Sequence, residues 1–461
     1  MSGLTDNQLK KLLAKRAKKE LVEWLVEQSA NHEDLRRALV GFVGPQAETT
    51  TLVSELKQII TKAWQRTRTS REPWKLARPI AADLEPVLPA LDQLIERGQA
   101  GAAEKVLRRF VEAADKGFEH VDDSYGYLGP LCQEAVTLWG KAWANIEPRD
   151  PAKLAQMVYD GVRDNGYAIR DHMIRDFADA LGREGVLALK ELFLAEHQAR
   201  LTDDALDDWK RREPLRYLAD VADALGDVDM YIDVQRQSGL LDVYAMPIAR
   251  RLLDVGRATE ALAYIDRADP SRSYFRGEKD DRTTLRVKIL QALGRDGEAR
   301  DTLWKTFRRS LNTAALDQLL ALTAAEDQQA LIDEAVAVAE AYPDKLTAAT
   351  FLRGRGHVDR AAATIDAHPD EFDGRYYGLL LPLAEAIQHD HPAAAWVLYR
   401  SLLLNILEEK RSKAYHHAAD YLAIAGELAA RADLDEKHQA LLTQLQSEHG
   451  RKYAFWRLVK Q

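Results

Sequence analysis

Cysteine is almost absent from this chain of 461 residues, which holds Cys132 and no other. A single cysteine excludes a disulfide within the chain and a zinc site built from several thiolates. We expect Cys132 to fill space in the core, because a free cysteine packs as a small apolar residue. This cysteine usage suits a reducing compartment, so the sequence predicts a cytoplasmic protein.

Long apolar runs and a secretory leader are also missing. The longest apolar stretches, such as residues 402–404, are interrupted after a few positions and are too short to cross a bilayer. Residues 1–6 lack the basic-then-apolar pattern of a signal peptide. We therefore expect no membrane partner.

The familiar catalytic motifs are a third absence. The chain has no GxxxxGK[ST] phosphate loop, no GxGxxG, no HExxH and no GxSxG. The sequence accordingly assigns no catalytic residue, no metal ligand and no cofactor. It favours a protein without enzymatic activity and leaves an enzyme of unknown class as a remaining alternative.

The chain does contain a repeated sequence motif, in which a glycine is followed five positions later by an alanine. A glycine just past a helix end supplies the left-handed conformation that stops the helix. We expect the alanine to let the second helix of a hairpin approach the first closely. The pairs are Gly256 with Ala261, Gly294 with Ala299, Gly356 with Ala361 and, more loosely, Gly98 with Ala103.

These hairpins set the expected architecture. Alternation of period two is scarce, so we predict an all-α protein. Hairpins that bury their faces on neighbours predict an elongated α-solenoid of tetratricopeptide-like repeats behind an N-terminal helical segment. The expected domains are a basic N-terminal helical segment (1–72), a helical domain (73–200) and a repeat region with a C-terminal cap (201–461).

Charge is unevenly distributed along the chain. Residues 1–80 hold 15 Lys+Arg against 9 Asp+Glu, while the whole chain has a net charge of −9. One interpretation is solvated helix faces with cations near helix C-termini. The other is a docking site for an anionic partner such as nucleic acid. Candidate nucleic-acid contacts are Lys15, Arg16, Lys18, Lys19, Arg66 and Arg68.

Two side-chain clusters are candidate sites. Residues 119–123 (Glu-His-Val-Asp-Asp) offer ligands for a hard cation, but neighbouring residues on a helix diverge, and acidic residues also cap helix starts. We expect a cap here and no metal. The second cluster is the tail, where basic residues are interleaved with aromatics, which suits either a solenoid cap or partner binding. Large aromatics before the tail are candidates for the concave face of the solenoid. Candidate partner contacts are Tyr376, Tyr377, Trp396, Tyr399, Arg411, Lys413, His416, Arg451 and Lys452.

Residues 109–126 and two stretches of the tail, residues 410–422 and 448–456, carry a family resemblance. With the intervening hairpins, they resemble an uncharacterised bacterial family of helical, tetratricopeptide-like proteins. The C-terminal part is similar to regions of proteins that bear a SWIM-type zinc finger. This chain lacks the finger, because one cysteine cannot build its metal site. The resemblance implies an architecture and assigns no activity.

The sequence as a whole favours a non-catalytic scaffold that binds a protein or peptide partner on the concave face of the solenoid. The alternative is a nucleic-acid-associated protein that uses the basic N-terminal and C-terminal segments. The sequence does not identify the partner.

Overall fold

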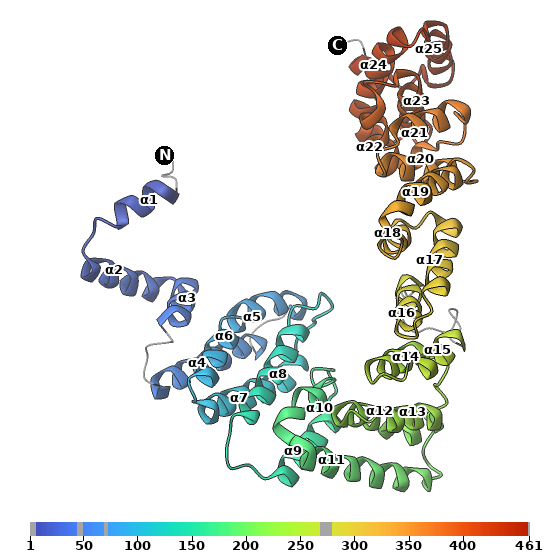
Figure 1. The fold of residues 1–461 in the computed structure, drawn as a ribbon. Helices are drawn as coiled ribbons and strands as arrows, with labels where there is room; N and C mark the ends of the chain where they lie inside the picture. The colour runs from blue at the N-terminus through green and yellow to red at the C-terminus, as the bar shows by residue number, and fades with distance from the viewer. Residues whose placement is uncertain (1–5, 44–48, 69–71, 268–278, 460–461) are drawn as a thin grey trace. The chain divides into compact units, whose positions relative to one another are not determined.

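A computed structural model describes residues 6–43, 49–68, 72–267 and 279–459. Within these ranges the secondary structure is helical, with no strand, which confirms the all-α prediction. The chain forms two compact units, Met1–Arg251 and Leu252–Gln461, and each is a succession of helical hairpins, as in an α-solenoid. Figure 1 labels the helices in chain order.

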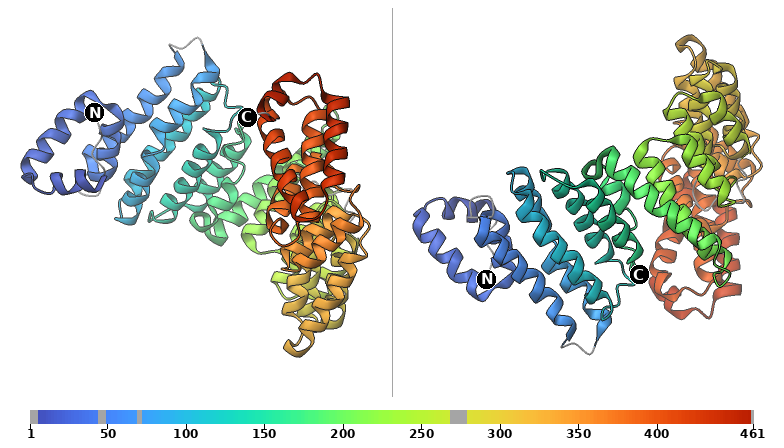
Figure 2. Two further views of the ribbon diagram at one scale, coloured as in Figure 1. Left: turned by 90° about the horizontal axis from the view of Figure 1, so that it is seen from above. Right: turned by 90° about the horizontal axis from the view of Figure 1, so that it is seen from below.

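In the first unit, consecutive helices pack against one another. The pairs α6–α7, α7–α8, α11–α12 and α12–α13 are in contact, and α9 packs on α11 across the short α10. Figure 2 shows α4 to α8 side by side. The helices are α1 (Asp6–Leu13), α2 (Lys18–Asn31), α3 (Glu33–Val43), α4 (Thr49–Gln65), α5 (Ala77–Leu84), α6 (Val87–Glu96), α7 (Ala100–Phe118), α8 (Gly129–Ala144), α9 (Pro151–Arg163), α10 (Met173–Asp176), α11 (Ala178–Leu201), α12 (Asp208–Leu225), α13 (Val228–Gln237) and α14 (Ala245–Asp254), which runs past the unit boundary.

The second unit follows the same plan, with α16–α17, α20–α21, α22–α23 and α23–α24 in contact. One continuous apolar core runs through it, from Val287 to Phe455. The helices are α15 (Ala258–Arg267), α16 (Lys279–Ala292), α17 (Asp296–Ser310), α18 (Thr313–Ala321), α19 (Ala325–Glu340), α20 (Lys345–Gly354), α21 (Val358–Ala367), α22 (Tyr377–Ile387), α23 (Pro392–Glu408), α24 (Tyr415–Arg431), α25 (Asp435–His449) and α26 (Tyr453–Val459).

The repeated glycines end helices as the sequence predicts. Gly294 has φ +67°, and the next amide, Arg295 N, donates to Leu290 O at 2.9 Å. This six-to-one bond with a left-handed residue is the Schellman motif. The glycines at 98, 226, 256 and 356 also have positive φ and are followed by the same bond, at 2.8–2.9 Å. Each of these helices therefore ends at a defined residue, after which the chain reverses direction and begins the second helix of the hairpin.

The four alanines of the repeated glycine–alanine motif are all fully buried. Ala103, Ala261, Ala299 and Ala361 each have 0% exposed surface. The predicted burial of Ala261 and Ala299 is thus confirmed. A side chain larger than a methyl group has no free volume at these positions, because protein interiors are close-packed.

The expected domain boundaries after residues 72 and 200 both lie inside the first compact unit. Near the first boundary, two short 3-10 helices, Arg66–Arg68 and Pro73–Lys75, precede α5. At the second, α11 continues to Leu201 before the chain turns toward α12.

The full burial of these alanines predicts a stability change. Ala261→Leu and Ala299→Leu should each lower the free energy of unfolding by about 1–3 kcal/mol, because the added atoms overpack a filled contact. The control is Ala292→Leu on α16, where the alanine is exposed. Urea denaturation measures all three variants. Parent-like midpoints for both core variants would contradict the alignment of the repeats.

Candidate functional site

A hollow of the first unit lies among α12, α13 and α14, and has a volume of about 620 Å³. Its lining mixes aromatic rings with charged and amide side chains, a composition typical of ligand sites. The lining residues are Asp208, Trp209, Arg212, Glu213, Leu215, Arg216, Ala219, Asp220, Asp223, Tyr231, Gln235, Ser238, Leu240, Tyr244 and Arg251.

Arg251 is the most firmly held cation in this hollow. Its Nε and Nη2 donate to the two carboxylate oxygens of Asp223 at 2.6 and 2.5 Å, and its Nη1 donates to Pro247 O at 3.0 Å. The guanidinium also lies 3.9 Å from the centre of the Tyr231 ring. Burial raises the pKa of Tyr231 to about 12, so the phenol is neutral at physiological pH. This wall of the hollow is therefore fixed and electrically balanced.

The other two arginines of the lining also have acidic partners. Arg216 lies 3.5 Å from Asp171 and stacks over the Tyr217 ring at 4.8 Å. Arg212 lies 3.6 Å from Asp208, one turn away on the same helix, and its Nη1 donates to Ser238 O at 3.3 Å. Both pairs sit toward solvent, where ion pairs are weak but still orient the side chains.

Asp220 differs from the other acidic residues of the lining. Among the residues that the structure describes, its carboxyl group makes neither a hydrogen bond nor an ion pair. Burial, followed by repulsion from Asp223, raises its pKa to about 7. A carboxyl group with a strongly raised pKa in a hollow is typical of a functional site.

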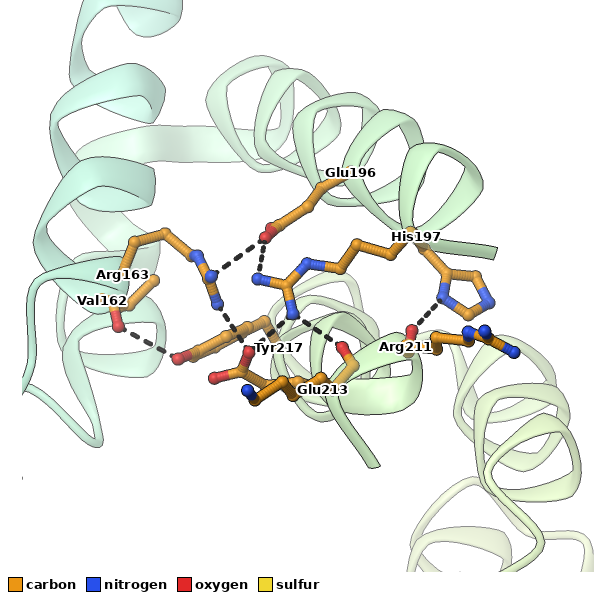
Figure 3. A network of polar contacts seen from close by, with 9 residues as sticks. Val162, Arg163, Glu196, His197, Arg211, Glu213 and Tyr217 are labelled. Atoms are coloured by element: carbon orange, nitrogen blue, oxygen red, sulfur yellow. Dashed lines mark hydrogen bonds and ion pairs between the residues drawn. The ribbon is translucent and has the colours of Figure 1, made fainter. Parts of the chain in front are cut away.

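Behind the hollow, α12 is held to α9 and α11 by a network of two arginines and two glutamates (Figure 3). Glu196 Oε1 lies 3.2 Å from Arg163 and 2.7 Å from Arg200. Glu213 Oε2 lies 3.2 Å from Arg163 and 2.8 Å from Arg200. Each cation is thus shared by both carboxylates. Because Glu213 also lines the hollow, the network fixes one of its walls.

Neighbouring contacts strengthen this attachment. Tyr217 Oη donates to Val162 O at 3.0 Å (Figure 3). The Tyr217 ring also stacks on Phe193, with the ring centres 4.9 Å apart. Burial opposes ionisation of Glu213, but hydrogen bonds from Arg200 and Arg163 hold its pKa below the ordinary value. Glu213 is therefore ionised at neutral pH, and the network joins three helices around the candidate site.

The second unit carries a different kind of surface at the start of α22. Tyr376 and Tyr377 are 53% and 64% exposed, and Leu379 is also exposed. Leu379 lines a second hollow of about 460 Å³, which Thr350 also lines. Among the described residues, the buried hydroxyl of Thr350 has no hydrogen-bond partner. The other lining residues are Leu311, Thr313, Asp317, Thr347, Phe351, Gly354 and Arg355.

Two of the four aromatic candidates do not lie on a surface. Trp396 and Tyr399 are 4% and 2% exposed and belong to the core of the second unit. Tyr399 Oη donates to Gln388 Oε1 at 3.2 Å, which satisfies its hydroxyl. The expectation that these two residues contact a partner is corrected, because α23 is buried on several sides at once. Tyr376 and Tyr377 remain available.

The basic residues of the tail are accessible, while its aromatics are mostly packed. Tyr415 and Phe455 are buried, and Trp456 Nε1 donates to His449 O at 3.0 Å. This packing agrees with the interpretation of the tail as a solenoid cap. The candidate contacts Arg411, Lys413, His416 and Arg451 are exposed, and Lys452 is half-buried.

The basic N-terminal segment is partly neutralised by its own acids. Arg16 lies 3.0 Å from Glu20, and Lys19 lies 3.9 Å from Glu23. Arg66 lies 2.6 Å from the buried carboxylate of Asp83. Of the remaining nucleic-acid candidates, Lys15 and Lys18 are exposed, and the side chain of Arg68 lies outside the described residues.

In the acidic cluster at 119–123, Asp123 acts as a helix cap. Its Oδ1 accepts from Tyr127 N at 2.8 Å, and its Oδ2 accepts from Leu128 N and Gly129 N at 3.0 and 2.8 Å. These amides stand at the start of α8, where unpaired N–H groups need acceptors. Asp122 accepts from Ser124 N at 2.9 Å in the same turn. In the described part of the chain, no three His, Cys, Asp or Glu residues are grouped to hold a metal ion.

Cys132 lies in the core of the first unit with no exposed surface. Burial raises the pKa of its thiol to about 12, so the sulfur is protonated and unreactive at neutral pH. Among the described helices, none combines the length and the apolar character needed to cross a membrane.

Sequence reasoning missed the hollow that contains Asp220. Arg216 and Asp220 are four residues apart on α12, a spacing that favours an ion pair on a helix surface. In the structure, Arg216 instead forms an ion pair with Asp171 and stacks over the Tyr217 ring. The sequence gives no sign that Asp220 lacks a partner, because Arg216 stands at the spacing where a partner is normally found.

Comparison with known proteins places the chain in a family. Residues 1–458 match the Family of unknown function (DUF6880), so the chain belongs to that family. A search of curated proteins found no significant match. One solved structure, a "Circular tandem repeat protein with novel repeat topology and enhanced subunit contact surfaces", matches with 13% identity and a TM-score of 0.19. The match covers 89% of this chain and 98% of that one, and a score this low defines neither a common fold nor a function.

The four-residue network predicts a large effect of one substitution. Glu196→Ala should lower the free energy of unfolding by about 2–4 kcal/mol, because it leaves two partly buried arginines without one of their carboxylates. The control is Glu191→Ala, an exposed residue of the same helix. Denaturant titration compares the two variants. Equal, small losses would show that the network does not stabilise the unit.

Asp220 predicts an unusual dependence of stability on pH. Its pKa is raised from 3.8 to about 7, so across that interval the native state holds more protons than the unfolded chain. The free energy of unfolding should therefore fall as pH rises through this window. Asp220→Asn should be more stable than the parent at about pH 8, by at least about 1 kcal/mol, and no more stable below about pH 4.

Thermal or chemical unfolding at several pH values measures this difference. Asp233→Asn on α13 is the control, because Asp233 is exposed and paired with Arg236. A parent-like pH profile in Asp220→Asn would contradict the assignment of a raised pKa to this carboxyl group.

Proposed function

We propose that this protein is a non-catalytic interaction scaffold that binds a peptide segment of a partner protein on α18, α20 and α22. The observation that carries the proposal is the exposure of Tyr376, Tyr377 and Leu379 beside the second hollow. Large aromatic and aliphatic side chains that stay exposed together are typical of protein interaction surfaces.

The chemistry of the hollow supports a peptide as the occupant. Phe351 and Leu379 offer apolar contact, while Thr313 and Thr347 add hydroxyl groups. The buried hydroxyl of Thr350 lacks a partner in the described part of the chain, and an unmet hydrogen bond of this kind costs about 1–3 kcal/mol. The N–H and C=O groups of a bound peptide backbone would meet it. A helical-repeat scaffold presents such a surface on rigid elements.

The proposal also concerns the organism and the cellular compartment of the protein. A bacterial protein of the reducing cytoplasm remains our prediction, together with a likeness of the C-terminal part to SWIM-finger proteins. The nucleic-acid alternative gains less support, because Arg16, Lys19 and Arg66 already have carboxylate partners. The exposed cations of the tail stay candidates for contact with an acidic partner segment.

A comparative pull-down tests the proposal. The parent and the triple variant Tyr376→Ser, Tyr377→Ser, Leu379→Ser are immobilised and exposed to the native cytoplasm, with and without nuclease, before mass spectrometry. We expect a nuclease-insensitive protein that the triple variant binds at least about tenfold less tightly, since central aromatic contacts carry about 1.4 kcal/mol or more.

Tyr125→Ser is the matched control, because Tyr125 is an exposed tyrosine of the first unit. Its capture profile should equal that of the parent. A partner retained by the triple variant would reject the surface at α22. Enrichment that disappears with nuclease would favour the nucleic-acid alternative.

A further inference from the structure

We propose that the hollow among α12, α13 and α14 binds an organic cation, an ammonium or guanidinium group, which pairs with the carboxyl group of Asp220. The site lies wholly in the first unit and does not depend on the surface around Tyr376 and Tyr377. The inference therefore stands independently of the proposed function.

The charged residues that line the hollow favour a cationic ligand. Its lining holds four acidic residues and three arginines, an excess of one negative charge. Arg251 is fixed by Asp223, while Glu213 is held by Arg163 and Arg200 from behind the wall. Of the four acidic residues that line the hollow, Asp220 is the one whose carboxyl group makes no hydrogen bond or ion pair with the residues that the structure describes.

The surroundings of Asp220 also favour a ligand over a purely structural role. Asp220 is half-buried, and burying a carboxylate without a partner is costly. Asp220 faces a hollow with room for a side chain or a small molecule. Tyr244 and Trp209 line the same space, and aromatic rings attract cations through their faces. Trp209 is 64% exposed, so it stands at the rim where a ligand would enter.

Protonation of Asp220 makes the binding depend on pH. The charged and titratable groups that face it are Asp223 and Arg216 on α12, Arg175 on α10, Arg251 on α14 and Tyr231 on α13. The arginines stay cationic and Tyr231 stays neutral near pH 7. Since the pKa of Asp220 is about 7, its ionised fraction falls from about nine tenths at pH 8 to about one tenth at pH 6. Affinity for a cation should weaken about tenfold over this range.

Titration followed by NMR tests the proposal with defined probes. The first is a blocked Gly-Gly-Arg-Gly-Gly peptide, and its control is the same peptide with citrulline, the neutral isostere of arginine. Agmatine serves as a free small guanidine. We expect the arginine peptide to bind at least about tenfold more tightly than the citrulline peptide at about pH 8, and to lose that advantage at about pH 6. Tighter binding of the peptide than of agmatine would indicate a side chain as the source of the cation, and the reverse a small molecule.

Two variants assign the effect to the carboxyl group. Asp220→Asn should bind the arginine and citrulline peptides equally, whereas Asp233→Asn should behave as the parent. Equal binding of the two peptides to the parent, or no binding by either at up to about 10 mM, would overturn the proposal. Discrimination that persists in Asp220→Asn would also overturn it. A partner captured in the pull-down despite these results would leave the α22 surface intact as a separate finding.

Discussion

The left-handed helix end is the constraint on which this fold depends. Each hairpin needs a helix that stops at a fixed residue, so that the next helix returns along it. Where glycine is missing, the chain still adopts the turn: Lys410 and Asp433 have φ +54° and +55°. Both are followed by the same six-to-one bond, at 3.1 Å after Lys410 and 2.9 Å after Asp433. The strain of about 1–2 kcal/mol at such a residue is accepted because the packing on either side requires the turn.

Close packing at the alanines converts these turns into a continuous core. A buried methyl group leaves room for a neighbouring helix to pack closely, and larger side chains on either side can then interdigitate. In the second unit the result is a core that continues from one hairpin to the next. Such a structure has no single centre, so surfaces suited to different ligands can form at different hairpins.

Electrostatics separates the structural charges from those available for binding. Most described arginines in the first unit are held by carboxylates, and the cluster of Arg163, Arg200, Glu196 and Glu213 is the clearest case. Burying such a cluster contributes little net stability, but it fixes which helices face one another. Asp220 stands outside this pattern. Its unfavourable environment lowers stability at neutral pH, a cost of the kind that is common at binding sites.

The sequence by itself determined the local features of this protein. A helix end, the alanine after it and the cap formed by Asp123 involve residues only a few positions apart, so their geometry follows from the backbone and the spacing. For the same reason, the all-α class and the hairpin pattern could be predicted.

The tertiary structure alone decided which side chains are accessible and how they are paired. The spacing of Trp396 and Tyr399 on α23 does not reveal that neighbours cover that helix on several sides. Likewise, the spacing of Arg216 and Asp220 favours an ion pair between them. Arg216 instead pairs with Asp171, which comes from a distant part of the chain. Local order depends on the backbone, whereas exposure and charge pairing depend on elements that the chain brings together from far apart in the sequence.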